Sequence, residues 1–156
     1  MVLKKIERIS QSGRHPTEDL ASILYVEDED SNWNVTELHL RNKYHLFRAK
    51  TAAETFAFLT QQSVDLILLD IQLAGSEFDG IEICKILKRV PFQEIPTAAK
   101  VIDCRSTPIV FVTAYAERHT KEALIKAGAD DVITKPVDFT RMRLVSSRLI
   151  IRSLKK

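Results

Sequence analysis

Short apolar runs alternate with longer amphipathic segments from residue 21 to the end of the chain. The short runs are rich in Val, Ile, Leu and Phe, which is typical of buried strands. The longer segments have the apolar spacing of helices that pack one face on a core. The expected strands cover residues 21–26, 45–49, 64–69, 108–113 and 131–134.

An expected helix follows each strand. The second helix opens with the capping-box pattern "TAAE", and the fourth ends at Gly128, where we expect a left-handed C-terminal cap. The third helix ends before Pro91 and should bury a row of apolar residues, namely Ile81, Cys84, Leu87 and Val90. The expected helices cover residues 31–42, a segment from Thr51, 79–90, 117–129 and a last segment from about Asp138.

This alternation predicts an α/β fold, a doubly wound five-stranded parallel sheet with helices on both faces and right-handed crossovers. The expected strand order is 2-1-3-4-5, the flavodoxin-like architecture. In such sheets, ligands bind in the crevice at the carboxyl ends of the strands. The residues that follow each strand are therefore the first place to look for chemistry.

Two segments fall outside this pattern. Residues 1–20 contain Gly13 and the pair His15-Pro16, so we expect a flexible N-terminal extension and a single domain over residues 21–156. Residues 91–107 form a connection that is long for a compact α/β domain. Long connections are either functional or disordered, and the sequence leaves both alternatives open.

Composition narrows the classes of function. The 156 residues are 45% hydrophobic and 7% aromatic, which suits one domain with an ordinary core. The net charge of +2 gives no reason to expect nucleic acid as a partner, and the basic stretch "RMRLVSSRLIIRSLKK" is interpreted as the solvated face of the last helix. No apolar run is long enough to span a membrane, so we expect a cytoplasmic protein. Cys84 and Cys104 are expected to be free thiols.

Polar side chains follow four of the expected strands. The first strand is followed by Glu27 and Asp28, and the third by Asp70. The fourth strand ends at Thr113 and the fifth is followed by Lys135. Because the carboxyl ends of parallel strands meet at one edge of the sheet, these side chains are expected to share a pocket.

Three neighbouring carboxylates repel one another, and a single lysine offsets only part of their charge. A hard divalent cation resolves this conflict, and Mg²⁺ is the expected ion because it prefers a few carboxylates and keeps waters that a phosphate can displace. With such an ion, Asp70 could act as a nucleophile that forms an aspartyl phosphate. Lys135 would then pair with one phosphate oxygen, and the Thr113 hydroxyl would donate to another.

The ordered motifs "ILYVEDE", "DLILLDIQLAGSEFDGIEICKILK", "PIVFVTAYAE" and "AGADDVITKPV" make the chain resemble the response-regulator receiver domain of two-component signalling, over about residues 21–154. The resemblance implies that Asp70 accepts the phosphoryl group and that Thr113 and Lys135 assist. It implies Mg²⁺ ligands from Glu27, Asp28, Asp70 and the backbone carbonyl of Gln72. It also implies a cis peptide bond before Pro136.

The chain departs from the family pattern at several positions. Glu27 replaces the commoner Asp, and its longer side chain can still reach a metal ion. The loop from Asp70 to Gly80 has two additional residues and carries Ala74 where Pro is typical, so we expect it to be more mobile. Val132 occupies the position of the usual Tyr or Phe, three residues before the lysine, and Tyr115 is a candidate substitute.

The leading hypothesis is a signalling switch that a histidine kinase or phosphotransfer domain phosphorylates. It would act on a downstream protein, or on a second copy of itself, through the last two helices and the last strand. The main alternative is a pseudo-receiver that binds partners without being phosphorylated. A phosphohydrolase is disfavoured because Gln72 stands where a second acid would be needed, and a flavodoxin-like cofactor protein because acids follow the first strand.

Overall fold

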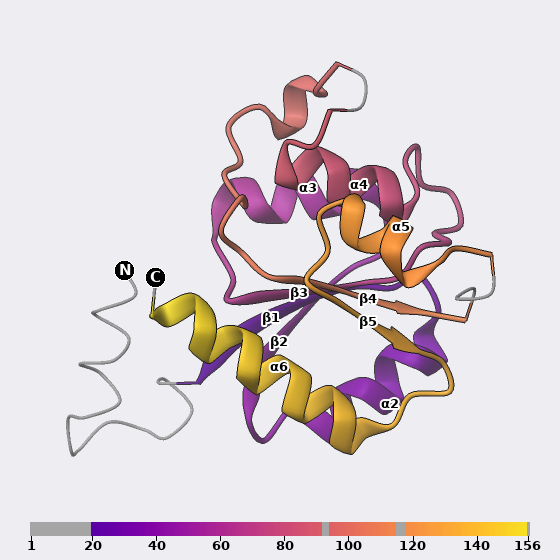
Figure 1. Cartoon of the computed structure of the whole chain (residues 1–156), viewed down its shortest axis with the longest axis vertical. Helices are drawn as coiled ribbons and strands as arrows, with labels where there is room; N and C mark the ends of the chain where they lie inside the picture. Colours follow the sequence, from indigo (N-terminus) through magenta and orange to yellow (C-terminus); the bar gives the residue numbers. More distant parts are fainter. Residues whose placement is uncertain (1–19, 92–93, 115–117, 156) are drawn as a thin grey trace.

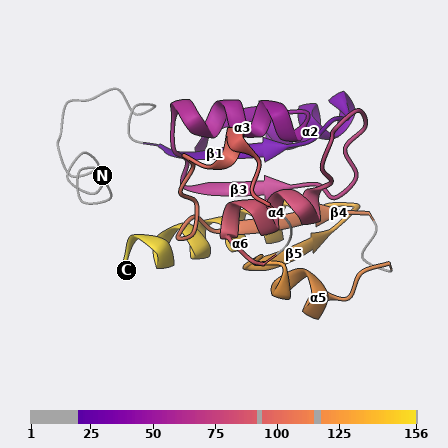
Figure 2. The same cartoon turned by 90° about the horizontal axis from the view of Figure 1, so that it is seen from above.

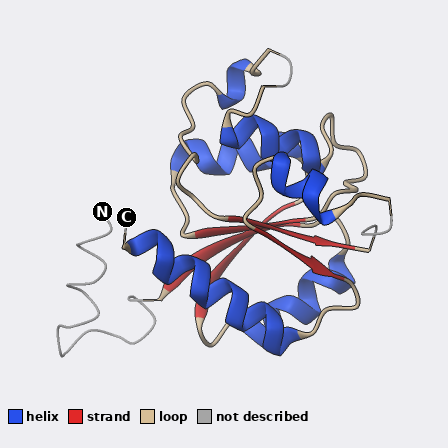
Figure 3. Cartoon of the chain, in the orientation of Figure 1, coloured by secondary structure: helices blue, strands red, loops and turns tan. Residues whose placement is uncertain are grey.

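The computed structural model describes residues 20–91, 94–114 and 118–155, and they form a five-stranded sheet with helices on both faces (Figure 3). All strand pairs are parallel, and the strand order is β2-β1-β3-β4-β5. The predicted fold class and strand order are therefore confirmed. The strands are β1 (Ala21–Val26), β2 (Tyr44–Ala49), β3 (Leu66–Leu69), β4 (Ile109–Thr113) and β5 (Asp131–Thr134).

Helices cover the sheet in two layers (Figure 1). On one face lie α2 (Asp30–Leu40) and α6 (Phe139–Leu154). On the other lie α3 (Ala52–Gln61), α4 (Gly80–Lys88) and α5 (Lys121–Lys126). Figure 2 shows these three helices one after another along the sheet. Because both faces are covered, all four residues of β3 are buried, as the continuous apolar run "LILL" requires.

Polar side chains define where four of the helices begin. Thr51, Thr120 and Asp138 each accept a backbone N–H from the first turn of α3, α5 and α6, respectively. The box expected at Thr51 is only half formed, because the Glu54 carboxylate accepts the N–H of Lys50 rather than that of Thr51. A complete capping box stands instead at the start of α4, between Asp79 and Glu82.

Several predicted boundaries were wrong, and one predicted helix face was right only in part. Helix α5 begins at Lys121, four residues later than expected, because Thr120 caps it. Helix α4 buries Cys84 and Leu87, as predicted, and also Ile83 and Ile86. The other two members of the expected row, Ile81 and Val90, are only half-buried. A spacing of three drifts around a helix with 3.6 residues per turn, which explains this error.

Arg89 begins the connection after α4 and holds it through hydrogen bonds. Its backbone adopts the left-handed conformation, with φ 57°. Its guanidinium donates to the carbonyl oxygens of Ile86, Ala99 and Ile102 at 2.7–3.1 Å. The connection contains a short 3₁₀ helix, Thr97–Ala99, which contacts α3. Ala99, Ile102 and Cys104 are buried. Three residues of the described part of this long connection therefore belong to the core.

Other expectations have a mixed outcome. Cys84 and Cys104 are free, as predicted, and both are buried. No helix in the described residues is long and apolar enough to cross a membrane. Tyr115 and residues 1–19 of the expected N-terminal extension lie outside the described residues.

Candidate functional site

A cleft lies at the carboxyl ends of β1, β3 and β5, where the sequence predicted a shared pocket. Asp28, Asp70, Gln72 and Lys135 line it, together with Glu29, Asn32, Leu73, Ala74, Asp79 and Ala114. Its volume is about 650 Å³. Asp70 and Gln72 follow the central strand β3, Glu27 and Asp28 follow β1, and Lys135 follows β5. The sheet therefore brings residues that are more than 100 positions apart into one site.

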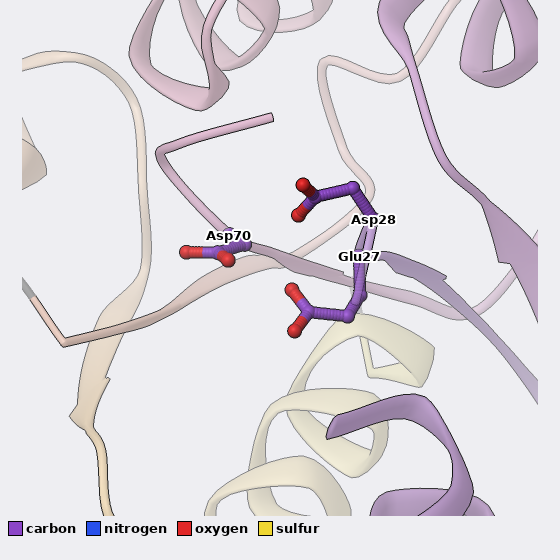
Figure 4. A group of neighbouring side chains, drawn as sticks. All are labelled: Glu27, Asp28 and Asp70. Carbon is purple, nitrogen blue, oxygen red and sulfur yellow. The ribbon is translucent and has the colours of Figure 1, made fainter. Parts of the chain in front are cut away.

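Three carboxylates gather at the base of this cleft (Figure 4). One oxygen each from Glu27, Asp28 and Asp70 lie within 4.8 Å of one another. Glu27 is fully buried and Asp70 is 7% exposed. Glu27 Oε2 has no hydrogen-bond partner among the described residues, which is costly for a buried oxygen. The site therefore contains an acceptor that the protein itself leaves unsatisfied.

Lys135 offsets part of this negative charge. Its Nζ lies 3.2 Å from Glu27 Oε1 and 3.2 Å from Asp70 Oδ2. Burial is the largest cause that raises the pKa of Glu27 to about 8, and the adjacent Asp70 carboxylate raises it further. The Lys135 ammonium lowers this pKa but does not cancel the effect. Without a metal ion, the pKa of Glu27 therefore lies well above its usual range.

The backbone around Asp70 fixes the direction of its carboxylate. The N–H of Ile71 donates to Asp70 Oδ1 at 2.8 Å, and the N–H of Asp70 donates to the carbonyl of Val26 at 3.0 Å. Gly80 packs against this segment so closely that a Cβ there would lie 2.0 Å from the Asp70 carbonyl oxygen. The start of α4 and the end of β3 thus fit together only because residue 80 has no side chain.

Thr113 ends β4, the strand next to the one that Asp70 follows. It is fully buried and is not among the described residues that line the cleft. Its carbonyl oxygen accepts the N–H of Lys135 at 2.9 Å, which ties the ends of β4 and β5 together. The peptide bond between Lys135 and Pro136 is cis, as the resemblance implied.

The loop between Asp70 and Gly80 is held by side-chain contacts. The N–H of Ala74 donates to Asp28 Oδ2 at 3.1 Å, a contact that proline could not make. Ser76 Oγ accepts the N–H of Ala52 at 2.8 Å and donates to the carbonyl of Phe78. These contacts tie the loop to the acidic residues and to the start of α3, and they weigh against the mobility expected from the sequence.

Arg48 was missed at the sequence level. Its guanidinium, at the end of β2, donates to the carbonyl oxygens of Glu27 and Asp28. The available signal was a charged residue in the apolar strand "YHLFRA". Nothing in the sequence indicated which backbone atoms it would reach.

Val132, at the position where the family usually has an aromatic ring, borders a second pocket of about 260 Å³. The pocket is lined by His119, Lys121, Leu124, Val132, Thr134 and Arg141. Val132 itself is 8% exposed. There is thus open space beside the valine, between α5, β5 and the start of α6.

The first site has the chemistry of a divalent-cation site. Carboxylate oxygens are the ligands that Mg²⁺ prefers, and no described Cys or His accompanies them in the cluster, as a zinc site would require. Glu27 Oε2 is a buried acceptor without a partner among the described residues, and the neighbouring Asp70 carboxylate adds to the burial that raises the pKa of Glu27. The residues therefore fit Mg²⁺.

Comparison with known proteins agrees with this geometry. The family model described as the response regulator receiver domain matches residues 23–146. The chain is 33% identical over 115 residues to the regulatory protein VanR of Enterococcus faecium, a match that covers 73% of this chain and 43% of VanR. It is 31% identical over 142 residues to the response regulator PleD of Caulobacter vibrioides, covering 87% of this chain and 28% of PleD. The chain thus spans less than half the length of either relative.

A solved structure gives a third comparison. The receiver domain of the sensor histidine kinase PA1611 from Pseudomonas aeruginosa PAO1 superposes with a TM-score of 0.68 and 26% sequence identity. The match covers 84% of this chain and 98% of that domain. That structure has a magnesium ion coordinated in its active-site cleft.

Proposed function

The chain belongs to the response regulator receiver family, and we propose that it is a phosphorylation-dependent switch in which Asp70 accepts a phosphoryl group with Mg²⁺. The donor would be a phosphohistidine on a histidine kinase or phosphotransfer domain. The observation that carries the proposal is the placement of Asp70 beside Lys135 and the other two acids in one cleft.

Each residue has a defined task in this proposal. The Asp70 carboxylate attacks phosphorus while the P–N bond of the phosphohistidine breaks, and the electron pair of that bond returns to the imidazole. The product is an acyl phosphate on Asp70. Lys135, already 3.2 Å from Asp70 Oδ2, transfers its ion pair to a phosphoryl oxygen. Thr113 is fully buried, so its end of β4 would shift to bring the hydroxyl to the phosphoryl group.

Glu27, Asp28, Asp70 and the backbone carbonyl of Gln72 would hold Mg²⁺. The ion supplies positive charge that offsets the negative charge on the transferring group. Asp28 and Gln72 line the cleft, and Glu27 lies beneath it with one unsatisfied oxygen. Among the described side chains, Lys135 supplies positive charge to these carboxylates, and Mg²⁺ would supply the rest.

Movement of Thr113 would change the shape of the neighbouring surface formed by α5, β5 and α6. A downstream protein or a second copy of the chain would bind there. We further propose that residues 21–156 form the receiver domain and that residues 1–20 are an extension outside it. The main rival remains a pseudo-receiver that binds its partner without phosphorylation.

Intact-mass measurement after incubation with a small-molecule phosphodonor tests the proposal. We expect one phosphoryl adduct that requires Mg²⁺ and is absent from Asp70→Asn. The matched control is Asp65→Asn, at the other end of β3, where the side chain accepts the N–H and hydroxyl of Ser22. This control should retain the adduct. Folded, Mg²⁺-binding protein that forms no adduct would favour the pseudo-receiver.

A further inference from the structure

Arg48 binds the backbone of the turn that carries the acidic residues. This turn, Glu27 to Glu29, connects β1 to α2 and is called the acidic turn below. Arg48 Nε donates to the carbonyl of Glu27 at 3.0 Å, and Nη2 donates to the carbonyl of Asp28 at 3.1 Å. One planar guanidinium thus spans two successive peptide groups.

The surroundings of Arg48 hold the guanidinium in place. Nη1 lies 2.7 Å from Asp30 Oδ1, and the guanidinium carbon lies 5.8 Å from the centre of the Trp33 ring. The side chain is 17% exposed. Beside it, the N–H of Glu27 donates to the carbonyl of Ala49 at 2.9 Å. The acidic turn is therefore attached to the end of β2 by three hydrogen bonds to its backbone.

The choice of acceptor atoms matters for cation binding. Lys135 contacts carboxylate oxygens, so it competes with a cation for Glu27 and Asp70. The hydrogen bonds of Arg48 to Glu27 and Asp28 use carbonyl oxygens and leave the carboxylates of these two residues to a cation. Arg48 therefore stabilises the backbone that orients the two side chains without taking their place as ligands.

We propose that Arg48 is a positioning residue for the divalent-cation site, which fixes the acidic turn so that Glu27 and Asp28 face Asp70. This inference rests on the function proposed above and names the residue that preorganises its metal site. Groups outside the ligand set that orient the ligands commonly determine a large part of metal affinity.

Simple electrostatics predicts the opposite effect of an Arg48 substitution on Mg²⁺ affinity. A cation near an acidic site repels Mg²⁺, so removing the charge of Arg48 should tighten Mg²⁺ binding if charge alone mattered. If positioning matters, losing the guanidinium that donates to both carbonyl oxygens should weaken Mg²⁺ binding even when the positive charge is kept. Arg48→Lys keeps the charge and the aliphatic stem but cannot donate to both carbonyls. Arg48→Gln removes the charge as well.

Titration calorimetry of Mg²⁺ into the full chain provides the test. We expect the dissociation constant to rise about tenfold in both variants. Lys50→Gln is the matched control, because Lys50 Nζ lies 3.5 Å from the same Asp30 oxygen, yet its side chain is half exposed and is absent from the hydrogen bonds to the acidic turn. This control should bind Mg²⁺ as tightly as the parent or slightly more tightly.

Phosphorylation supplies a second measurement that a general loss of stability would not reproduce. In Arg48→Lys, the Mg²⁺ concentration that gives half the maximal rate should rise, whereas the rate at saturating Mg²⁺ should match the parent. Parent-like Mg²⁺ affinity in Arg48→Lys, or tighter binding in Arg48→Gln, overturns the role of Arg48 alone. A parent protein that binds no Mg²⁺ overturns the proposed metal site and the role of Arg48 with it.

Discussion

Lys135 Nζ lies 3.2 Å from Asp70 Oδ2, although β4 separates the strands that carry these two residues. The same Nζ also lies 3.2 Å from an oxygen of Glu27, which follows β1. One ammonium therefore links the residues that follow β1, β3 and β5 at the carboxyl edge of the sheet. The stability of the protein without a metal ion should depend on this contact.

Replacing Lys135 with Gln should destabilise the metal-free protein by about 2 kcal/mol, because the mostly buried Asp70 carboxylate would lose its cation. Urea unfolding at pH 7 measures this, and Mg²⁺ should restore part of the loss. The control is Lys121→Gln, since Lys121 pairs with Asp131 from an exposed position and Arg148 also pairs with that carboxylate. It should cost less than about 0.5 kcal/mol. Equal losses would contradict the prediction.

The metal-free protein should become less stable as the pH rises from about 4.5 to about 8. Folded Glu27 keeps its proton up to about pH 8, whereas an unfolded glutamate releases it near 4.5. The folded state therefore binds more protons across this window, and its stability falls with pH by at most about 1.4 kcal/mol per pH unit. Urea unfolding at several pH values measures the slope. Glu27→Gln should remove this contribution, and an unchanged slope in that variant would contradict the assignment.

Two glycines should respond differently to alanine. Gly80→Ala should cost about 3 kcal/mol or more, because its Cβ would lie 2.0 Å from the Asp70 carbonyl oxygen. Gly75→Ala should cost about 1 kcal/mol, because its φ is +72° but no atom lies within 4 Å of the new Cβ. Thermal and urea unfolding of both variants test this order. A reversed order would show that the contact between α4 and the Asp70 backbone relaxes easily.

Val132→Tyr should change the free energy of unfolding by less than about 1.5 kcal/mol, because the ring can enter the pocket beside Val132. The matched control is Ile133→Tyr, one residue later on β5, which is 1% exposed and packs among the core residues under α2 and α6. Overpacking there should cost about 3 kcal/mol. A comparable loss at both positions would mean that the pocket cannot accept a ring.

Much of the fold and part of the site could be predicted because they depend on local signals. The five apolar runs gave all five strands with errors of at most two residues, and the spacing of the helices predicted the parallel sheet. A parallel sheet necessarily brings the carboxyl ends of its strands together, so Glu27, Asp70 and Lys135 could be placed in one pocket.

The remaining features depend on register and loop geometry, which the sequence does not specify. Arg48 reaches the acidic turn because Arg48 pairs with Tyr25, two residues before Glu27. Ser76 Oγ accepts the N–H of Ala52, the first residue of α3, only because the loop folds across to it. Arg89 donates hydrogen bonds to the carbonyl oxygens of Ala99 and Ile102, ten or more residues further along the chain. None of these contacts has a sequence spacing from which it could be predicted.

The site joins two parts of the sheet that should open at different rates. Asp70 follows β3, the middle strand, which is paired on both sides, whereas Lys135 follows β5, an edge strand of the described sheet. Fraying of β5 can separate Lys135 from Asp70 while the N–H of Asp70 stays bonded to Val26. Amide hydrogens of β5 should therefore exchange with solvent before those of β3. Loss of the Lys135 contact with the nucleophile is then set by local opening at one edge of the sheet rather than by unfolding of the domain.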